Sequence, residues 1–268
     1  VSSIQFIFNE SELTAGTRGA SLGPRALKIA AYNVQSSIFQ SYPIHVLPNN
    51  DEALNNINVK PFAKRIEDFV DVFKNVDSAI TNAIEKNTFP IVIAGDHGSA
   101  AGTIASLQKN YPNKKLGVVW IDAHADLHSP YTTPSGNMHG MPLAIALGED
   151  NLESRCNEPH PETVKLWNDL KSFNSTGKIQ PEHLVFVAVR DTETPENNLM
   201  KRLNIKNHTV DEVRRKGPKV IARDILKQLE PCDLIYVSFD VDSMDPVEVS
   251  YGTGTPVKNG LFPIEALD

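Results

Sequence analysis

The stretch LGVVWIDAHAD, residues 116–126, joins a continuous apolar run to three side chains of the kind that bind metal ions. An apolar run without polar alternation is typical of a strand that helices cover on both faces, as in a parallel sheet. Asp122, His124 and Asp126 alternate by two, so an extended segment would point all three to the same side. The stretch therefore predicts a buried parallel strand that ends in a cluster of potential ligands.

Other apolar runs recur along the chain, with segments of helical spacing between them. The expected strands are Ile4–Phe8, Ile44–Leu47, Pro90–Ala94, Leu116–Ile121, Leu184–Val189 and Leu234–Phe239. The expected helices are Pro61–Lys86, Ala100–Tyr111, Glu196–Leu203 and Pro218–Leu229. The first of these helices has apolar residues at steps of three and four, which draw one stripe. Alternation of strands and helices predicts a doubly wound α/β sheet in a single domain over residues 1–268.

Two long stretches have no regular pattern. Ser129–His139 is rich in Pro, Ser, Thr, Gly and Asn, and it follows the ligand motif directly, so we expect it to be functional. Asn151–Pro181 is polar with scattered prolines, and we expect a surface excursion around a short helix.

The composition excludes several classes of protein. The 268 residues are 40% hydrophobic and 22% charged with a net charge of −7, and the longest basic run is Arg214–Lys216, so we expect no nucleic-acid partner. No run approaches the ~18 apolar residues of a membrane-spanning helix, so no membrane partner is expected. The first residues do not resemble a signal peptide, and Cys156 and Cys232 are far apart, so a cytoplasmic location is expected.

Two further motifs follow expected strands in the same way. Gly95–Ser99 supplies His97, and Ser238–Pro246 supplies Asp240 and Asp242. The carboxyl ends of parallel strands meet at one edge, where ligands of such sheets bind. A single Asp at a strand end is often only a helix cap, but three motifs at one edge favour a metal centre. The four carboxylates balance two divalent cations, and a site of carboxylates and imidazoles suits hard ions such as Mn²⁺.

Together these motifs resemble the ureohydrolase family, which includes arginase and agmatinase, from about Gly16 to the end of the chain. The resemblance implies a three-layer α/β/α sandwich, arginase-like, with a mostly parallel sheet. It implies Mn²⁺-dependent hydrolysis of a guanidino group to urea and an amine. The loop after the ligand motif is most similar to that of arginases, which implies L-arginine as substrate and L-ornithine and urea as products.

The resemblance also implies a role for each ligand residue. One Mn²⁺ would be held by His97, Asp122, Asp126 and Asp240. The other would be held by Asp122, His124, Asp240 and Asp242. A hydroxide between the two ions would attack the guanidinium carbon, with Asp126 orienting it and His139 moving a proton to the leaving amine.

For the substrate, the resemblance implies two groups of contacts. Thr133, Ser135 and Asn137 in the loop Thr132–Gly140 would bind the α-carboxylate. Glu193 and Glu196 would bind the α-ammonium group, although two acidic residues at a helix start are also favoured by the helix dipole alone.

The sequence departs from the arginase pattern at several positions. His128 stands where arginases usually have Asn at a carboxylate contact, Glu193 stands where they have Asp, and Gly98 replaces the usual Ser. Another ureohydrolase activity therefore stays open, namely that of an agmatinase, a guanidino-acid hydrolase or a formimidoylglutamase. The sequence is also compatible with a degenerate, non-catalytic member of the family, and with a deacetylase that holds a single zinc ion on a similar sheet.

The resemblance implies a last helix and a last strand that this sequence does not contain. In the family that strand lies inside the sheet, so we expect a sheet from which the last strand is missing and a C-terminally incomplete domain. Members of the family are commonly trimers or hexamers, so a homo-oligomer is expected, together with a small guanidino substrate as the other partner.

Overall fold

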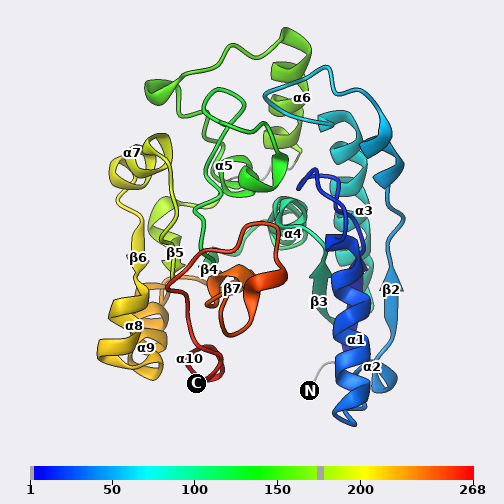
Figure 1. Ribbon diagram of the computed structural model, residues 1–268, viewed down its shortest axis with the longest axis vertical. Coiled ribbons are helices and arrows are strands. Elements are labelled where there is room, and N and C mark those ends of the chain that lie inside the picture. The colour runs from blue at the N-terminus through cyan, green and yellow to red at the C-terminus, as the bar shows by residue number, and fades with distance from the viewer. Residues whose placement is uncertain (1–2, 174–177) are drawn as a thin grey trace.

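A computed structural model describes residues 3–173 and 178–268. The strands lie in two sheets whose pairings are all parallel, β2-β1-β3 and β6-β5-β4-β7 (Figure 1). Their bounds are Ile4–Asn9 for β1, Ile44–Val46 for β2, Phe89–Ala94 for β3, Leu116–Ile121 for β4, Leu184–Val187 for β5, Lys206–His208 for β6 and Leu234–Phe239 for β7. The expected α/β class is confirmed, and the strands form two parallel sheets, as expected of a sheet from which an interior strand is missing.

Helices connect the strands and pack on the sheets. The larger helices are α1 Gly23–Asn33, α3 Ile66–Glu85, α4 Ala100–Asn110, α6 Pro161–Ser172, α7 Thr194–Arg202 and α9 Pro218–Gln228. The shorter helices are α2 Ile38–Ser41, α5 Pro142–Leu147, α8 Val210–Lys216 and α10 Pro263–Leu267. No helix in the described part of the chain is long and apolar enough to cross a membrane.

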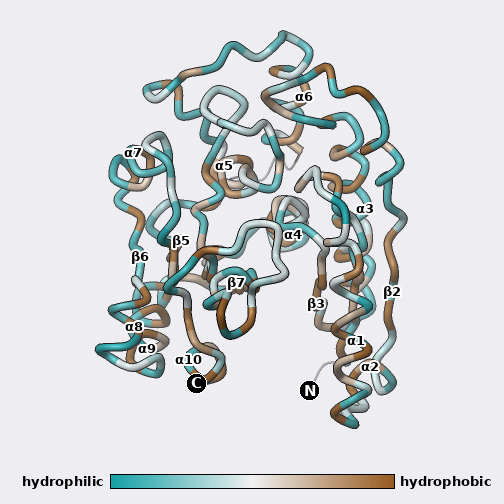
Figure 2. The backbone as a smooth tube through the Cα atoms, viewed as in Figure 1, coloured by the Kyte–Doolittle hydropathy of each residue, from teal (hydrophilic) through white to brown (hydrophobic). Residues whose placement is uncertain are grey.

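Strand β4 lies in the middle of three layers. Val118 and Trp120 point into a core cluster with residues of α4 and α5, whereas Val119 belongs to a second cluster with residues of α8 and α9. Because side chains alternate along a strand, one apolar run fills both cores. Hydropathy colouring shows another apolar run in β3, which is mostly brown (Figure 2). The structure therefore confirms the three-layer α/β/α arrangement.

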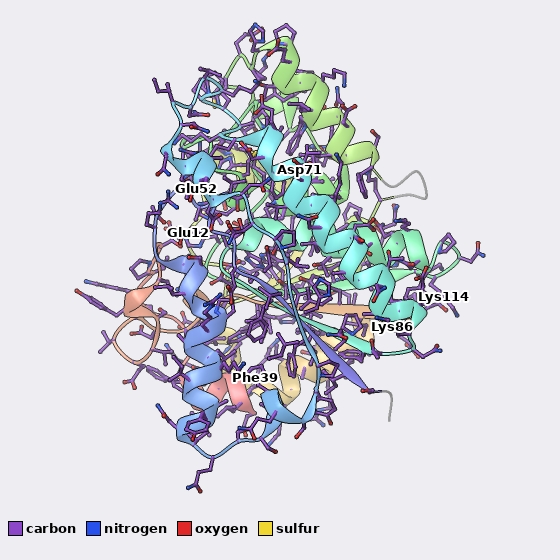
Figure 3. All side chains as sticks on the ribbon, turned by 90° about the vertical axis from the view of Figure 1, so that its right-hand side faces the viewer. Glu12, Phe39, Glu52, Asp71, Lys86 and Lys114 are labelled. Atoms are coloured by element: carbon purple, nitrogen blue, oxygen red, sulfur yellow. The ribbon has the colours of Figure 1, made fainter. Side chains whose placement is uncertain are left out.

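Helix α3 covers the first sheet. Val76 and Ile80 pack with Ile7 of β1, and Figure 3 views this helix from outside, with Asp71 and Lys86 toward its two ends. The prediction that the helix starts at Pro61 is wrong, since it begins at Ile66. The backbone at Arg65 has a φ of 58°, a left-handed conformation that ends the preceding turns before the helix can start.

Two other predictions need correction. Strand β5 ends at Val187 and not at Val189, because Ala188 has a φ of 70° that turns the chain out of the sheet. The surface excursion predicted over Asn151–Pro181 contains α6, whose Trp167 and Leu170 lie in the core, although residues 174–177 fall outside the described part. Strand β6 was not predicted because its three residues are polar or charged.

Strands β3 and β7 face each other across the gap between the two sheets. Residues of both strands line a cavity of about 660 Å³. Within residues 3–173 and 178–268, no strand pairs with the free edge of either one. The carboxyl ends of β3, β4 and β7 are nevertheless brought to one side of the molecule, where the candidate site lies.

Candidate metal centre

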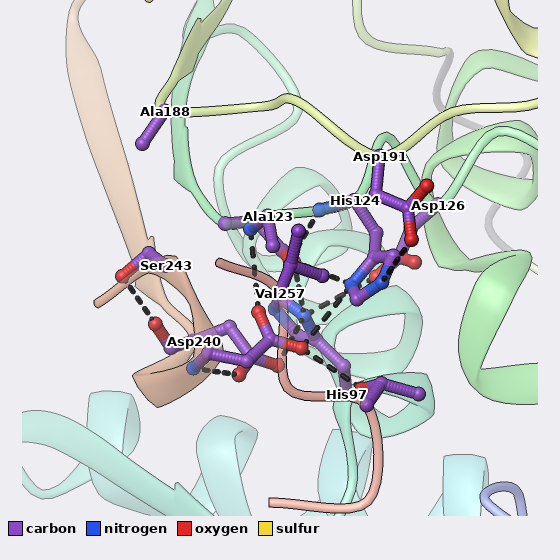
Figure 4. A network of polar contacts seen from close by, with 12 residues as sticks. His97, Ala123, His124, Asp126, Ala188, Asp191, Asp240, Ser243 and Val257 are labelled. Atoms are coloured by element: carbon purple, nitrogen blue, oxygen red, sulfur yellow. Dashed lines mark hydrogen bonds and ion pairs between the residues drawn. The ribbon is translucent and has the colours of Figure 1, made fainter. Parts of the chain in front are cut away.

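Six predicted ligand residues gather at the carboxyl ends of three strands. The loop after β3 supplies His97, and the segment after β4 supplies Asp122, His124 and Asp126. Strand β7 pairs with β4 in parallel and is followed by Asp240 and Asp242. Figure 4 shows four of them, His97, His124, Asp126 and Asp240, gathered in one place, with Asp191 beside His124. The tertiary structure therefore assembles the cluster that the three motifs predicted.

His97 is the centre of the first group. Its Nδ1 lies 2.9 Å from Oδ2 of Asp122, 3.2 Å from Oδ2 of Asp126 and 3.2 Å from Oδ2 of Asp240. His97 Nδ1 and Asp122 Oδ2 are both buried and neither has a hydrogen-bond partner of good geometry. Buried atoms of this kind normally have a partner, so their convergence fits a cation.

His124 is the centre of the second group. Its Nδ1 lies 3.1 Å from Oδ2 of Asp242 and 3.5 Å from Oδ1 of Asp122. The two oxygens of Asp122 therefore face different groups, Oδ2 the first and Oδ1 the second. A carboxylate placed in this way can bridge two neighbouring cations. For Asp240, the second oxygen accepts the backbone N–H of Asp242 at 2.9 Å.

The position of Asp126 in the cluster is not explained by the alternation of side chains along an extended segment. Its φ of 51° lies in the left-handed region, which aspartate adopts more readily than most non-glycine residues. The backbone N–H of Leu143, in α5, donates to its carbonyl at 3.2 Å. The prediction that one extended segment aims all three ligands is thus wrong for Asp126, although its carboxylate arrives at the expected place.

Without cations the cluster holds protons instead. Burial and the charge of Asp122 raise the pKa of Asp126 to about 7. Burial alone would lower the pKa of His124, but its contacts with Asp122 and Asp242 outweigh burial and raise it to about 11. Burial likewise opposes the charged form of His97, yet three carboxylates raise its pKa well above the usual value. Positive charge is therefore required to stabilise this arrangement.

Several supporting contacts were not predicted from the sequence. Both oxygens of Asp242 are held, Oδ1 by the N–H of Ala123 at 3.2 Å and Oδ2 by the hydroxyl of Thr255 at 2.9 Å. The guanidinium of Arg190 donates to the carbonyls of Asp242 and Val257, at 3.0 and 2.7 Å. These contacts join segments far apart in the chain, so no local pattern predicts them.

The glycine at position 98 is explained by a close contact with Thr14. A Cβ at this position would lie 2.4 Å from Oγ1 of Thr14, so a serine could not be accommodated without movement. The absence of a side chain at Gly98 therefore leaves room for the side chain of Thr14.

The loop after the ligand motif is ordered by its own contacts. Thr133 is buried and its Oγ1 accepts the N–H of Gly136 at 2.9 Å, whereas Ser135 is exposed and its Oγ accepts the N–H of Asn137 at 3.1 Å. Asn137 lies against Gly16, whose added Cβ would be 3.1 Å from its Oδ1. The three predicted carboxylate contacts thus lie in one short turn.

His139 lies near the metal cluster and is held by its backbone N–H, which donates to the carbonyl of Thr14 at 3.3 Å. Burial lowers the pKa of this imidazole, and the neighbouring charge on His124 acts in the same direction. The ring is therefore neutral at pH 7 and can accept a proton.

A second cluster lies beside the first. His128 Nε2 lies 2.9 Å from Oε2 of Glu193 and 3.5 Å from Oε2 of Glu196. The oxygens of Glu196 accept the N–H groups of Leu127 and Glu193, both at 3.1 Å. Burial and the carboxyl of Glu193 raise the pKa of Glu196 to about 9. Glu196 thus joins the start of α7 to the ligand loop, while Glu193 is half-exposed and open to a substrate.

Comparison with known proteins gives consistent results. The sequence model of the arginase family matches residues 6–268. An arginase of Staphylococcus aureus (strain COL) is 33% identical over 251 residues, which cover 91% of this chain and 76% of that protein. An arginase of Bacillus subtilis (strain 168) is 32% identical over 259 residues, 93% of this chain and 78% of that protein.

Solved structures show the same similarity. Entamoeba histolytica arginase in complex with L-ornithine has a TM-score of 0.80 at 27% identity, covering 99% of this chain and 84% of that one. A Bacillus subtilis arginase structure has a TM-score of 0.81 at 29% identity with the same coverage. A formimidoylglutamase of Bacillus subtilis, at 18% identity and a TM-score of 0.71, shares the fold.

Proposed function

The chain belongs to the arginase family of hydrolases, which act on guanidino carbon–nitrogen bonds, and on that premise we propose that it hydrolyses L-arginine to L-ornithine and urea with two bound Mn²⁺ ions. One observation carries the proposal. The two oxygens of Asp122 face two separate ligand groups, so that a pair of cations could share this carboxylate. Because both groups also contain an imidazole and further carboxylates, they offer the donors that suit Mn²⁺.

The residues present fit the metal pair. His97, Asp126 and Asp240 would complete one site around Asp122, and His124 and Asp242 would complete the other. When bound, the two ions supply Lewis acidity and lower the pKa of a shared water.

Two side chains would manage the protons of the reaction. Asp126 faces the first group, and as a metal ligand its carboxylate would be deprotonated and would accept a hydrogen bond from the attacking water, which orients that water. His139 is neutral, since burial lowers its pKa, so it would first accept a proton released from the attacking water and then deliver that proton to the nitrogen that leaves as the amine. The charges of cluster residues, among them Asp240, act on this imidazole, which supports the role.

Substrate orientation would come from the loop and the second cluster. Thr133, Ser135 and Asn137 would hold the α-carboxylate, and Glu193, which is half-exposed, would accept the α-ammonium group. His128 is bonded to Glu193, so it would limit how this carboxylate moves. Glu196 is engaged by two backbone N–H groups, which favours a supporting role over direct contact with substrate.

The test combines metal counting with product analysis. The purified protein is loaded with Mn²⁺, and urea release is measured with arginine, agmatine and guanidinobutyrate, and formamide release with formimidoylglutamate. Two ions per chain and a preference for arginine are expected. Turnover of another substrate without urea from arginine would replace the arginase proposal, and a single ion would contradict the metal pair.

An Asp126→Asn variant separates an enzyme from a non-catalytic family member. The amide removes the charge of a proposed metal ligand and is a weaker acceptor for the attacking water, so urea release should fall by at least about 100-fold. If the variant released urea as fast as the unaltered protein, the cluster around Asp126 would not be a catalytic centre.

A further inference from the structure

A segment between α5 and α6 lies against the loop Ser129–His139. In this segment, Arg155–Glu158, which we call the strap, the side-chain amide of Asn157 donates to the carbonyl of Thr133 at 2.7 Å and to that of Pro130 at 3.3 Å. An amide nitrogen carries two hydrogens, so these two bonds use its whole capacity as a donor. One side chain thus ties together two points of the loop.

The backbone of the strap adds to this contact. The N–H groups of Cys156 and Asn157 both donate to the carbonyl of Tyr131, at 2.9 and 3.0 Å. The guanidinium of Arg155 lies over the Tyr131 ring, 5.3 Å from its centroid. The strap leads directly into α6, whose Trp167 lies in the core. The strap is therefore anchored through a buried helix and can hold the loop in place.

The bond to Thr133 acts on the turn that carries the proposed carboxylate contacts. Thr133 is buried, and its carbonyl lies two residues before Ser135. On the other side of the turn, the backbone N–H of Lys64 donates to the carbonyl of Gly136 at 2.8 Å. The turn is thus held by a side chain, that of Asn157, on one side and by backbone on the other.

We propose that Asn157 is a positioning residue that holds the loop in the conformation that binds the α-carboxylate of the substrate. The inference rests on the proposed function for the identity of this ligand. A loop that is ordered before binding loses less conformational entropy when the ligand arrives, so it binds more tightly than a loop that is free to move. Because the side-chain bonds of Asn157 go to the loop, its loss should change KM more than kcat.

The variants are Asn157→Ala and Asn157→Asp. An aspartate has nearly the same shape but no side-chain N–H, and its charge would face two carbonyl oxygens, so it should impair binding at least as much as alanine. The matched control is Asn110→Ala. The amide of Asn110 is also half-buried and donates to Oγ1 of Thr81 and to the carbonyl of Ser106, both at 2.9 Å, where α4 packs on α3. The control therefore removes the same kind of bonds away from the loop.

The first measurement is steady-state kinetics of the Mn²⁺-loaded protein. In both Asn157 variants KM for arginine should rise about tenfold, while kcat should change by less than about twofold. Agmatine, which lacks the α-carboxylate, should bind within about twofold of normal, measured as a substrate or as a competitive inhibitor. Asn110→Ala should leave these constants unchanged. A normal KM in Asn157→Asp, a fall in kcat alone, or an equal loss of affinity for agmatine would each overturn the inference.

The second measurement does not depend on turnover. Hydrogen–deuterium exchange of the intact protein, followed by mass spectrometry of peptides from the loop, should be at least about fivefold faster in Asn157→Ala than in the unaltered protein or in Asn110→Ala. Unchanged exchange in the loop would overturn the inference. An unaltered protein that releases no urea from arginine would instead overturn the proposed function, while the exchange rates would still decide whether Asn157 holds the loop.

Discussion

Two neighbouring clusters both consist of histidine and acidic side chains, but they differ in whether their buried polar atoms have hydrogen-bond partners. In the cluster at the ends of β3, β4 and β7, buried His97 Nδ1 and Asp122 Oδ2 converge without a hydrogen-bond partner of good geometry. In the cluster of His128, Glu193 and Glu196, the buried carboxylate accepts two backbone N–H groups. The ligand atoms of each lie close enough together to hold a cation.

The difference teaches that proximity of ligand-type residues is not sufficient for a metal site. A carboxyl group whose two oxygens both have partners gains less from a cation than one, such as Asp122, with a buried oxygen that has none. We therefore expect the metal to bind at the first cluster, and the second to support the ligand loop and contact substrate. The predictions below test that division, from the largest expected effect to the smallest.

Asp122→Asn should have the largest effect. The amide removes the charge and one of the two oxygens that face the separate ligand groups, so both sites should weaken together. Urea release should fall by at least about 1,000-fold, and elemental analysis should find fewer than two Mn²⁺ per chain. Glu196→Gln is the matched control and should retain both ions. Loss of an ion in Glu196→Gln would contradict the expectation that metal binds only at the first cluster.

Metal affinity should decrease as the pH falls. His124 has a pKa of about 11 without metal, so binding must displace its proton throughout the range from pH 8 to pH 6. His97, whose pKa is also raised well above its usual value without metal, must lose a proton in the same way. Asp126, with a pKa of about 7, adds a further proton below pH 7. The affinity should thus drop by at least about 100-fold between pH 8 and pH 6. Calorimetry in buffers of different ionisation enthalpy measures the released protons, and binding without proton release would contradict the expected charge balance.

Glu196→Ala should reduce stability and leave the metal count unchanged. Two backbone N–H groups, those of Leu127 and Glu193, lose their acceptor, and the free energy of unfolding should fall by about 1–3 kcal/mol. Urea denaturation with a chelator present measures this change without a contribution from bound metal. If the midpoint of the urea denaturation curve did not change, Glu196 would not stabilise the ligand loop.

His128→Asn should have the smallest effect. The substitution removes the 2.9 Å contact with Glu193 and frees that carboxylate, so KM for arginine should change by about three- to tenfold while the metal count is retained. Steady-state kinetics with arginine and agmatine would show whether the change depends on the α-carboxylate. A loss of bound Mn²⁺ would instead place His128 among the ligands.

Local patterns were sufficient for much of the fold. The bounds of β4 and β7 agree with the prediction, because a continuous apolar run followed by polar ligands marks both ends of a buried strand. The start of α3, the end of β5 and the whole of β6 were not predictable in this way. Each of these features depends on a residue with a left-handed backbone or on pairing with another strand. The spacing of hydrophobic residues along the chain carries no information on either.

The sequence alone determined the class of fold and the six residues of the candidate centre, because their types and positions after apolar runs are local properties of the chain. Only the tertiary structure decided that the two oxygens of Asp122 face two groups, that Asp126 has a left-handed backbone, and that Nε2 of His97 lies 2.7 Å from Oγ of Ser238. The physical reason is that hydrogen bonds and ligand directions depend on how separate segments of the chain are placed in space, which no local pattern specifies.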